Sequence, residues 1–300
     1  MARSILITGA TGKQGGAVLS SLLDLPGSPF RLVAVTRSPD SDVAKSLVAK
    51  SPTLISVIGG NLDDPDAIFA AAGGHGTIWG VFSVQAGFKN EELQGKALVD
   101  SAVKHGVSHF IYSSVDRGGS LSDENPTDIP HFITKHHIEK HLKDVAPRHG
   151  MSWVILRPTA FFENVTPNFF GKIFAAAWKW QLPPSKPLQL VSCTDIGFFA
   201  AQAFANPEQW HNRSLSLAGD ELTFTEASEI FKEVTGEPAG LPVTYWFLQW
   251  ALVSMVKNLK TMFKFFAEMG YAADVGELRK MNPKMLDWKA WLQQSAFAKK

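Results

Sequence analysis

The fold is decided by the N-terminal stretch Met1-Ala-Arg-Ser-Ile-Leu-Ile-Thr-Gly-Ala-Thr-Gly-Lys-Gln-Gly-Gly16. Its apolar run Ile5 to Ile7 has the composition of a short buried parallel strand. Three glycines follow at a spacing of three, and the segment 14–24 has helical periodicity with one apolar face, formed by Val18, Leu19, Leu22 and Leu23. A strand, a glycine turn and a helix in this order are typical of a dinucleotide-binding site.

Each glycine of this turn has its own predicted role. Gly9 allows the tight turn, Gly12 lets backbone approach a pyrophosphate, and Gly15 lets the helix pack closely on the strand. The helix then presents its free N–H groups and its dipole to the phosphates. An ordinary strand-to-helix turn with surplus glycine is the alternative. The turn residues expected to contact the dinucleotide are Gly9, Thr11, Gly12, Lys13, Gln14 and Gly15.

Length, charge and cysteine content limit the class of protein. A chain of 300 residues suits one large domain or two unequal ones. The net charge of +1 gives no electrostatic footprint for nucleic acid. The single cysteine, Cys193, rules out an intramolecular disulfide framework and fits a reducing compartment.

No targeting or membrane segment is apparent. The N-terminus lacks the pattern of a secretory signal. The longest apolar run, 243–256, is interrupted by Gln249 and Ser254 and is shorter than the roughly 20 residues that a bilayer span needs. We interpret the run as a packed helix. We expect a cytoplasmic protein, monomeric or homodimeric and not membrane-bound, and nuclear entry stays open.

The first half of the chain alternates strand and helix patterns. We expect strands at 5–7, 30–36, 54–58, 77–84, 109–112 and 153–156, separated by helices at 14–24, 41–50, 64–72, 91–105 and 129–149. Inward positions of the fourth helix are expected to be Leu93, Ala97, Leu98 and Ala102. The alternation predicts an α/β fold with a doubly wound parallel Rossmann sheet, whose ligands bind at the carboxyl ends of the strands.

The end of the second strand predicts the cofactor type. NAD-binding proteins usually place an acidic residue there, whereas this chain has Thr36, Arg37 and Ser38. A guanidinium fork suits a 2′-phosphate, which a carboxylate would repel. We therefore expect NADP(H), with Arg37 as the main discriminator and Ser38 beside it. The alternative is a solvated surface arginine.

The next two strand ends carry further candidates. Asn61 and Asp63 are expected to hydrogen-bond the adenine edge, although Asp63 or Asp64 is also suited to cap the following helix. After the fourth strand, Ser83 would lie beneath the cofactor. Gln85 and Phe88 belong to a loop that could cover the nicotinamide.

Several short motifs together resemble the NmrA-like branch of the atypical short-chain dehydrogenase/reductases. They are Gly9 to Gly16, Arg37, Gly60-Asn-Leu-Asp63, Tyr112-Ser-Ser114, His131-Phe-Ile-Thr-Lys135, Leu156-Arg-Pro158, Phe162-Glu-Asn164, Thr194-Asp-Ile-Gly197, Leu217-Ala-Gly219 and Thr235-Gly236. The resemblance implies a Rossmann domain with a smaller, α-rich C-terminal substrate domain. It also implies either an NADPH-dependent reductase or a sensor of NADP(H) that regulates transcription through protein partners.

The catalytic centre departs from the usual pattern of short-chain dehydrogenases, which is a serine after the fifth strand and a Tyr-x-x-x-Lys pair. Ser113, Ser114 and Lys135 match that pattern, but His131 stands at the tyrosine position. A spacing of four places His131 and Lys135 on one helical face. The resemblance implies that Lys135 holds the nicotinamide ribose.

His131 has two interpretations. A neighbouring Lys135 ammonium favours the neutral imidazole, which can still polarise a carbonyl when its donor nitrogen points at it. Alternatively, His131 is a non-catalytic residue that fills the tyrosine's space. His136, His137 and His141 lie nearby in sequence, but no third metal ligand is indicated, so we expect a solvated polar face and no metal.

The alternation breaks at Arg157. We therefore expect a Rossmann domain at 1–156, with 190–218 returning to it, and a substrate domain at 157–189 and 219–300. Pro158 is expected at the cofactor, and Asp195 is expected to cap a helix ending at Ala205. Further elements are expected at 214–217, 225–235 and 245–270, with Trp288 and Trp291 anchoring the last helix. Candidate substrate contacts are Phe88, Phe161, Phe162, Asn164, Phe169 and Phe170.

Three functional hypotheses follow. The first is an NADPH-dependent reductase of an apolar or aromatic carbonyl, quinone or imine. The second is a non-catalytic NADP(H) redox sensor with a protein partner. The third is a cofactor-retaining isomerase or cyclase, which would form product without net consumption of NADPH.

Overall fold

The computed structural model describes residues 2–27, 30–85, 90–244 and 257–298. The chain divides into two compact units. The first comprises Met1–Ser114, Thr134–Arg157 and Ile196–Leu215, and the second comprises Val115–Ile133, Pro158–Asp195 and Ser216–Lys300. The division after Arg157 lies one residue from the expected boundary, whereas Val115–Ile133, expected in the Rossmann domain, belongs to the second unit.

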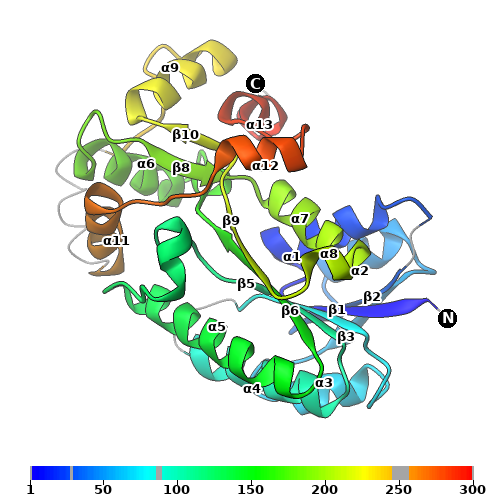
Figure 1. Cartoon of the computed structure of the whole chain (residues 1–300). Helices are drawn as coiled ribbons and strands as arrows, with labels where there is room; N and C mark the ends of the chain where they lie inside the picture. The colour runs from blue at the N-terminus through cyan, green and yellow to red at the C-terminus, as the bar shows by residue number, and fades with distance from the viewer. Residues whose placement is uncertain (1, 28–29, 86–89, 245–256, 299–300) are drawn as a thin grey trace. The chain divides into compact units, whose positions relative to one another are not determined.

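The first unit is built on a seven-stranded sheet in the order β3-β2-β1-β4-β5-β6-β9. Strands β1 to β6 pair in parallel, which confirms the predicted doubly wound sheet (Figure 1). The order reverses between β1 and β4, so their carboxyl ends form the switch point. The strands are β1 (Arg3–Ile7), β2 (Phe30–Thr36), β3 (Ile55–Gly59), β4 (Gly80–Ser83), β5 (His109–Ser113), β6 (Ser152–Pro158) and β9 (Arg213–Leu217).

Helices cover both faces of this sheet (Figure 1). On one face lie α3, α4 and α5, and on the other α1, α2 and α7. Their bounds, with that of the short α8, are α1 (Lys13–Leu23), α2 (Asp42–Lys50), α3 (Pro65–Ala71), α4 (Glu91–Lys104), α5 (Pro130–Arg148), α7 (Cys193–Ala205) and α8 (Pro207–Trp210). Contacts between α4 and α5 are close, since a Cβ on Gly95 would lie 2.4 Å from Ile138.

Two expectations for these helices are wrong. Leu93 is 73% exposed because α4 packs through Gly95, Leu98, Val99 and Ala102, which lie on another face. His136 is buried instead of solvated. His137 and His141 are hydrogen-bonded to residues of α4, Glu92 and Asp100 respectively.

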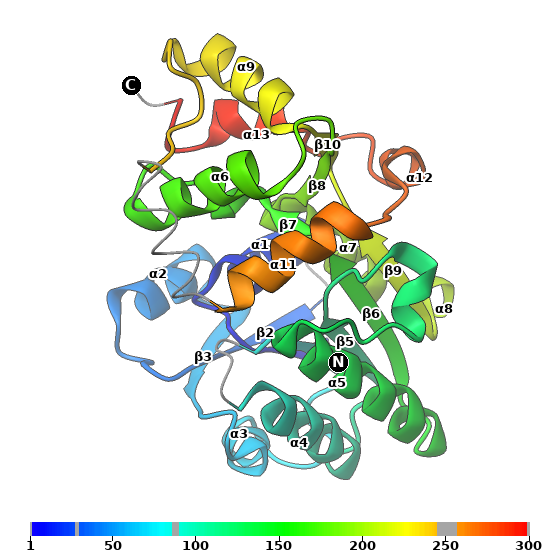
Figure 2. The ribbon, with the colours of Figure 1, turned by 90° about the vertical axis from the view of Figure 1, so that its left-hand side faces the viewer.

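The second unit contains a three-stranded sheet in the order β10-β8-β7 that the sequence pattern did not predict. These strands have only two to four residues, too few to show a periodicity. Helices complete the unit (Figure 2). Its core is rich in aromatic side chains. Its elements are η1 (Gly119–Asp123), β7 (Ala160–Phe161), η2 (Phe162–Asn164), α6 (Phe169–Gln181), β8 (Leu188–Val191), β10 (Asp220–Leu222), α9 (Phe224–Thr235), α11 (Lys257–Glu268), α12 (Val275–Met281) and α13 (Trp288–Gln294).

The predicted capping role of Asp195 is also wrong. Helix α7 begins at Cys193, and the N–H of Asp195 donates to Ser192 Oγ at 3.0 Å. The carboxylate instead accepts hydrogen bonds from Asn282 and Leu286. Of the helix expected at 245–270, residues 245–256 lie outside the described residues, and α11 begins at Lys257. Within the described ranges, no helix is both long and apolar enough to cross a membrane.

Candidate functional site

The glycine turn after β1 has no room for a Cβ at two of its glycines, Gly9 and Gly15. Gly9 has a φ of +59°, which favours glycine, and a Cβ there would lie 2.9 Å from Val84 Cγ1. A Cβ on Gly15 would lie 2.3 Å from the carbonyl oxygen of Gly9. A Cβ on Gly12 would lie 3.2 Å from the same oxygen. Both Gly9 and Gly15 are therefore required by the backbone path itself.

Helix α1 begins directly after this turn without a side-chain cap. Its N-cap residue is Gly12, and no side chain accepts a hydrogen bond there. Thr11, Gly12 and Lys13 are all exposed. The first N–H groups of a helix have no partner inside the helix, and its dipole favours an anion at this end. The turn and the helix start therefore fit a phosphate or pyrophosphate group.

The ends of β2 and β3 have different local structures. Arg37 and Ser38 are exposed directly after β2. At the end of β3, Asp63 accepts hydrogen bonds from Gln94 Nε2 at 2.7 Å and from Asn61 Nδ2 at 3.1 Å. These hydrogen bonds, that from Gln94 first, lower the pKa of Asp63. The cap of α3 is Asp64, which accepts from Ala67 N.

Two polar pairs lie at the switch point. Ser113 Oγ donates to Gln14 Oε1 at 2.5 Å, which joins the end of β5 to the first turn of α1. Gln85 Nε2 donates to Ser83 Oγ at 2.9 Å. Gln85 Oε1 is buried and accepts no hydrogen bond from any residue that the structure describes. A buried acceptor of this kind fits a donor from a bound molecule.

Ser114 belongs to a different network from Ser113. Its hydroxyl donates to Glu139 Oε1, and Arg157 donates to the same carboxylate through Nη2 at 2.6 Å and Nε at 3.2 Å. Glu139 and Arg157 are only 2% and 3% exposed. The Ser114 hydroxyl thus completes a buried ion pair between α5 and β6, and its catalytic role stays a prediction.

Neither residue of this ion pair was predicted as a site residue. Arg157 is part of the motif Leu156-Arg-Pro158, which carries the family resemblance, whereas Glu139 belongs to none of those motifs. Glu139 follows Lys135 by four residues on α5, so it lies on the same helical face. An acidic residue at that spacing, with an arginine inside an apolar strand, is the signal that indicates the pair.

Lys135 forms an ion pair with Glu91, a residue that was not predicted to belong to the site. Its Nζ lies 2.6 Å from Glu91 Oε1. Thr134 Oγ1 donates to the other oxygen of Glu91 at 3.1 Å. His131 is on α5 one turn before Lys135, and its ring packs edge-on against Phe132. The ammonium charge of Lys135, which the argument for a neutral His131 relied on, is thus compensated by Glu91.

Among the candidate substrate residues, Phe162 is corrected. Its ring is fully buried and packs against Trp288 and Trp291, so it belongs to the core of the second unit. Phe169 and Phe170 are 52% and 78% exposed at the start of α6. The remaining substrate candidates are Phe161 on β7 and Asn164 in η2, while Phe88 lies outside the described residues. Pro158, which was expected at the cofactor, is at the buried end of β6.

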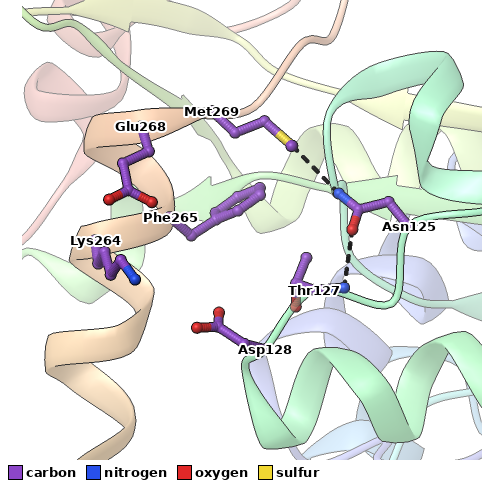
Figure 3. Close-up of a pocket in the computed structure, with 7 residues that line it drawn as sticks. All are labelled: Asn125, Thr127, Asp128, Lys264, Phe265, Glu268 and Met269. Atoms are coloured by element: carbon purple, nitrogen blue, oxygen red, sulfur yellow. Dashed lines mark hydrogen bonds between the residues drawn. The ribbon is translucent and has the colours of Figure 1, made fainter.

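The second unit has a pocket of about 360 Å³ between the segment before α5 and helix α11 (Figure 3). None of the predicted site residues lines it. Asn125 donates to Met269 Sδ at 3.2 Å and accepts from the N–H of Thr127 at 3.0 Å. The lining residues are Asn125, Thr127, Asp128, Lys264, Phe265, Glu268 and Met269.

A doubly wound sheet with a glycine turn leading into an uncapped helix defines a Rossmann-type protein. The NmrA-like family model matches residues 1–297. The chain therefore belongs to the NmrA-like family, which confirms the resemblance seen in its motifs.

Relatives and solved structures agree with this family. The chain is 28% identical to the NmrA-like family domain-containing oxidoreductase hkm9 of Aspergillus hancockii, over 81% of this chain and 76% of that protein. The NADPH-dependent quinone oxidoreductase QOR2 of Escherichia coli matches with a TM-score of 0.73 and 21% identity, over 97% of this chain and 99% of that one. NmrA, a negative transcriptional regulator, matches in complex with NADP with a TM-score of 0.71 and 16% identity, over 99% and 96%.

Proposed function

We propose that this protein binds NADP(H) and reduces an apolar or aromatic carbonyl, quinone or imine. The observation that carries the proposal is the glycine turn, because its backbone path excludes a Cβ at Gly9 and Gly15 and leads into an uncapped helix. This arrangement suits a pyrophosphate. The buried acceptor of Gln85 at the switch point supports a bound molecule above β4.

Arg37 supports the choice of NADP(H) over NAD(H). Its guanidinium is exposed at the carboxyl end of β2, where a dinucleotide's adenosine ribose is bound in this fold. Replacing Arg37 with Asp is expected to weaken NADPH binding by at least about tenfold more than NADH binding, because a carboxylate repels the 2′-phosphate. Fluorescence titration of both cofactors measures this ratio. Equal losses for the two cofactors would contradict the assignment.

The reductase assignment rests on residues of β5 and α5. NADPH, when bound, supplies a hydride. Lys135 would hold the ribose hydroxyls through its ammonium, and Ser113 would present its hydroxyl to the acceptor from the end of β5. His131 would donate the proton. The name of the Aspergillus hancockii relative and that of QOR2, a quinone oxidoreductase, support this class of reaction.

A sensor is the alternative function. The likeness in fold to NmrA, named as a negative transcriptional regulator, supports it, as does histidine at the usual tyrosine position. The exposed aromatic side chains Phe169, Phe170 and Trp180 on α6 would then serve a protein partner.

One experiment separates these functions. Affinities for NADP⁺ and NADPH are measured together with turnover of quinones, aldehydes and imines. Oxidation of NADPH with any acceptor class supports the reductase. Tight binding without turnover supports the sensor, and absence of binding contradicts both.

A further inference from the structure

A mostly buried ion pair joins α4 to α5 in the first unit. Glu91, the first residue of α4, is 4% exposed, and its partner Lys135 is 15% exposed. The carboxylate is bound through both oxygens, since Oε1 contacts Lys135 Nζ at 2.6 Å and Oε2 accepts from Thr134 Oγ1 at 3.1 Å. A carboxylate with both oxygens engaged has a fixed orientation.

The position of Glu91 favours this carboxylate for two local reasons. It lies in the first turn of α4, where the helix dipole stabilises negative charge. The close packing of α4 on α5 at Gly95 and Ile138 also holds the two helices at the distance that the pair needs. The ion pair is thus part of a rigid helix contact.

Lysine has a long side chain whose rotamer freedom must be lost when its ammonium is held at one point. Glu91 removes much of that freedom before any ligand binds. A Lys ammonium has three N–H donors, and Glu91 needs one of them. We propose that Glu91 is a positioning residue that holds the Lys135 ammonium ready for the ribose hydroxyls of NADP(H). This inference rests on the proposed function and adds a specific residue to it.

The adjacent residue provides a matched control. Glu92 also lies in the first turn of α4 and also bonds across to α5, through His137 Nδ1 at 2.9 Å. Its other partner is Lys96 at 2.6 Å. Replacing Glu92 therefore removes the same charge from the same helix turn and weakens the same helix contact, but leaves Lys135 untouched.

The test is NADPH affinity of the full chain, measured by fluorescence titration. Glu91→Ala is expected to weaken binding about tenfold, the affinity equivalent of one charge-assisted hydrogen bond. Glu91→Gln should weaken it less, because its amide oxygen still accepts from the ammonium. Glu92→Gln should stay within about twofold of wild type. Thermal unfolding shows whether each variant is folded. If Glu91→Ala is not folded, the test uses Glu91→Gln, which keeps the shape of the side chain.

A double-mutant cycle separates positioning from a purely structural role. If Glu91 acts through Lys135, then Glu91→Ala should add no loss of affinity in a Lys135→Ala background. An equal further loss in that background would overturn the inference, because the effect would not pass through Lys135. Wild-type affinity in both Glu91 variants would also overturn it.

Failure of the proposed function gives a different result. If the wild-type chain binds no NADPH, both the function and this inference are wrong. If the wild-type chain binds NADPH and the Glu91 variants bind equally well, only the inference is wrong.

Discussion

The two units compensate their buried carboxylates in different ways. In the first unit, Glu139 faces Arg157 and Glu91 faces Lys135. In the second, neutral groups donate the hydrogen bonds that the acids accept. Asp116 accepts from three backbone N–H groups, of Gly118, Gly119 and Ala272, and from the hydroxyl of Ser216. Asp195 accepts from Ser192, Asn282 and Leu286.

This difference determines how each unit responds to charge and to pH. A paired carboxylate keeps its charge, and loss of its partner leaves an ion buried without compensation. A carboxylate bound by neutral donors relies mainly on their hydrogen bonds to offset desolvation. At Asp195 desolvation by burial exceeds those bonds and raises the pKa to about 6. The first unit should therefore respond strongly to substitution, and the second to pH.

The largest effect is expected when the buried pair of the first unit is broken. Arg157→Met should lower the free energy of unfolding by about 3–5 kcal/mol, because Glu139 is left as an uncompensated buried charge. Urea denaturation measures the change. Adding Glu139→Leu should recover most of the loss. The control is Arg148→Ala on α5, whose exposed pair with Asp144 should be worth about 0.3–0.5 kcal/mol. Equal losses for Arg157→Met and Arg148→Ala would contradict the comparison.

A smaller effect is expected at the glycine turn, where no charge is involved. Gly15→Ala should cost about 1–3 kcal/mol, because its methyl group would meet the backbone of Gly9 and Ala10. NADPH binding should be lost with it. Gly16→Ala is the control, since its Cβ would lie 3.4 Å from the nearest backbone oxygen. There the better helix propensity of alanine should leave stability equal or raise it by up to about 1 kcal/mol. Similar behaviour of the two variants would show that the turn tolerates a side chain.

The smallest effect is a pH dependence in the second unit. The pKa of Asp195 is raised in the folded protein to about 6 from the ordinary value of 3.8. Between these two pKa values the folded state therefore binds a proton that the unfolded state does not. The contribution of Asp195 to the free energy of unfolding falls as the pH rises through 6. Between pH 7 and pH 5 the wild-type chain should gain about 1 kcal/mol over Asp195→Asn.

Urea denaturation of both chains at the two pH values measures this difference. Parallel stability curves for wild type and Asp195→Asn would contradict it. Glu163 and Arg279 also face Asp195, and Glu163 acts to raise its pKa while Arg279 acts to lower it. Glu163→Gln should accordingly reduce the dependence without removing it.

The first unit could be predicted from the sequence because its signals are local. The strand Ile5 to Ile7, the glycine spacing and the helix faces each involve residues within one or two turns of one another. The prediction that Leu93 faces inward was wrong because α4 packs through the face that contains Gly95. Glycine has no apolar side chain that would identify this face in the sequence. The strands of the second unit have only two to four residues, so they gave no pattern.

The candidate site divides in the same way. The glycine turn is a property of the backbone, and the sequence located each of its glycines. The side-chain contacts depend on which residues meet across elements, as Gln14 meets Ser113 and Glu91 meets Lys135. No periodicity in the sequence predicts those contacts. The position of Ser114 after the fifth strand therefore suggested a catalytic role, but gave no indication of its contact with Glu139.

The bond between Ser113 and Gln14 also has a consequence for the order in which the protein is made. Its two residues are 99 positions apart. The glycine turn leaves the ribosome early, but its helix acquires this partner only after β5 has been synthesised and has paired beside β4. A nascent chain that ends before Ser113 contains the whole glycine turn but lacks the hydroxyl that donates a hydrogen bond to Gln14. Completion of the contacts around the glycine turn during translation must therefore wait for the fifth strand.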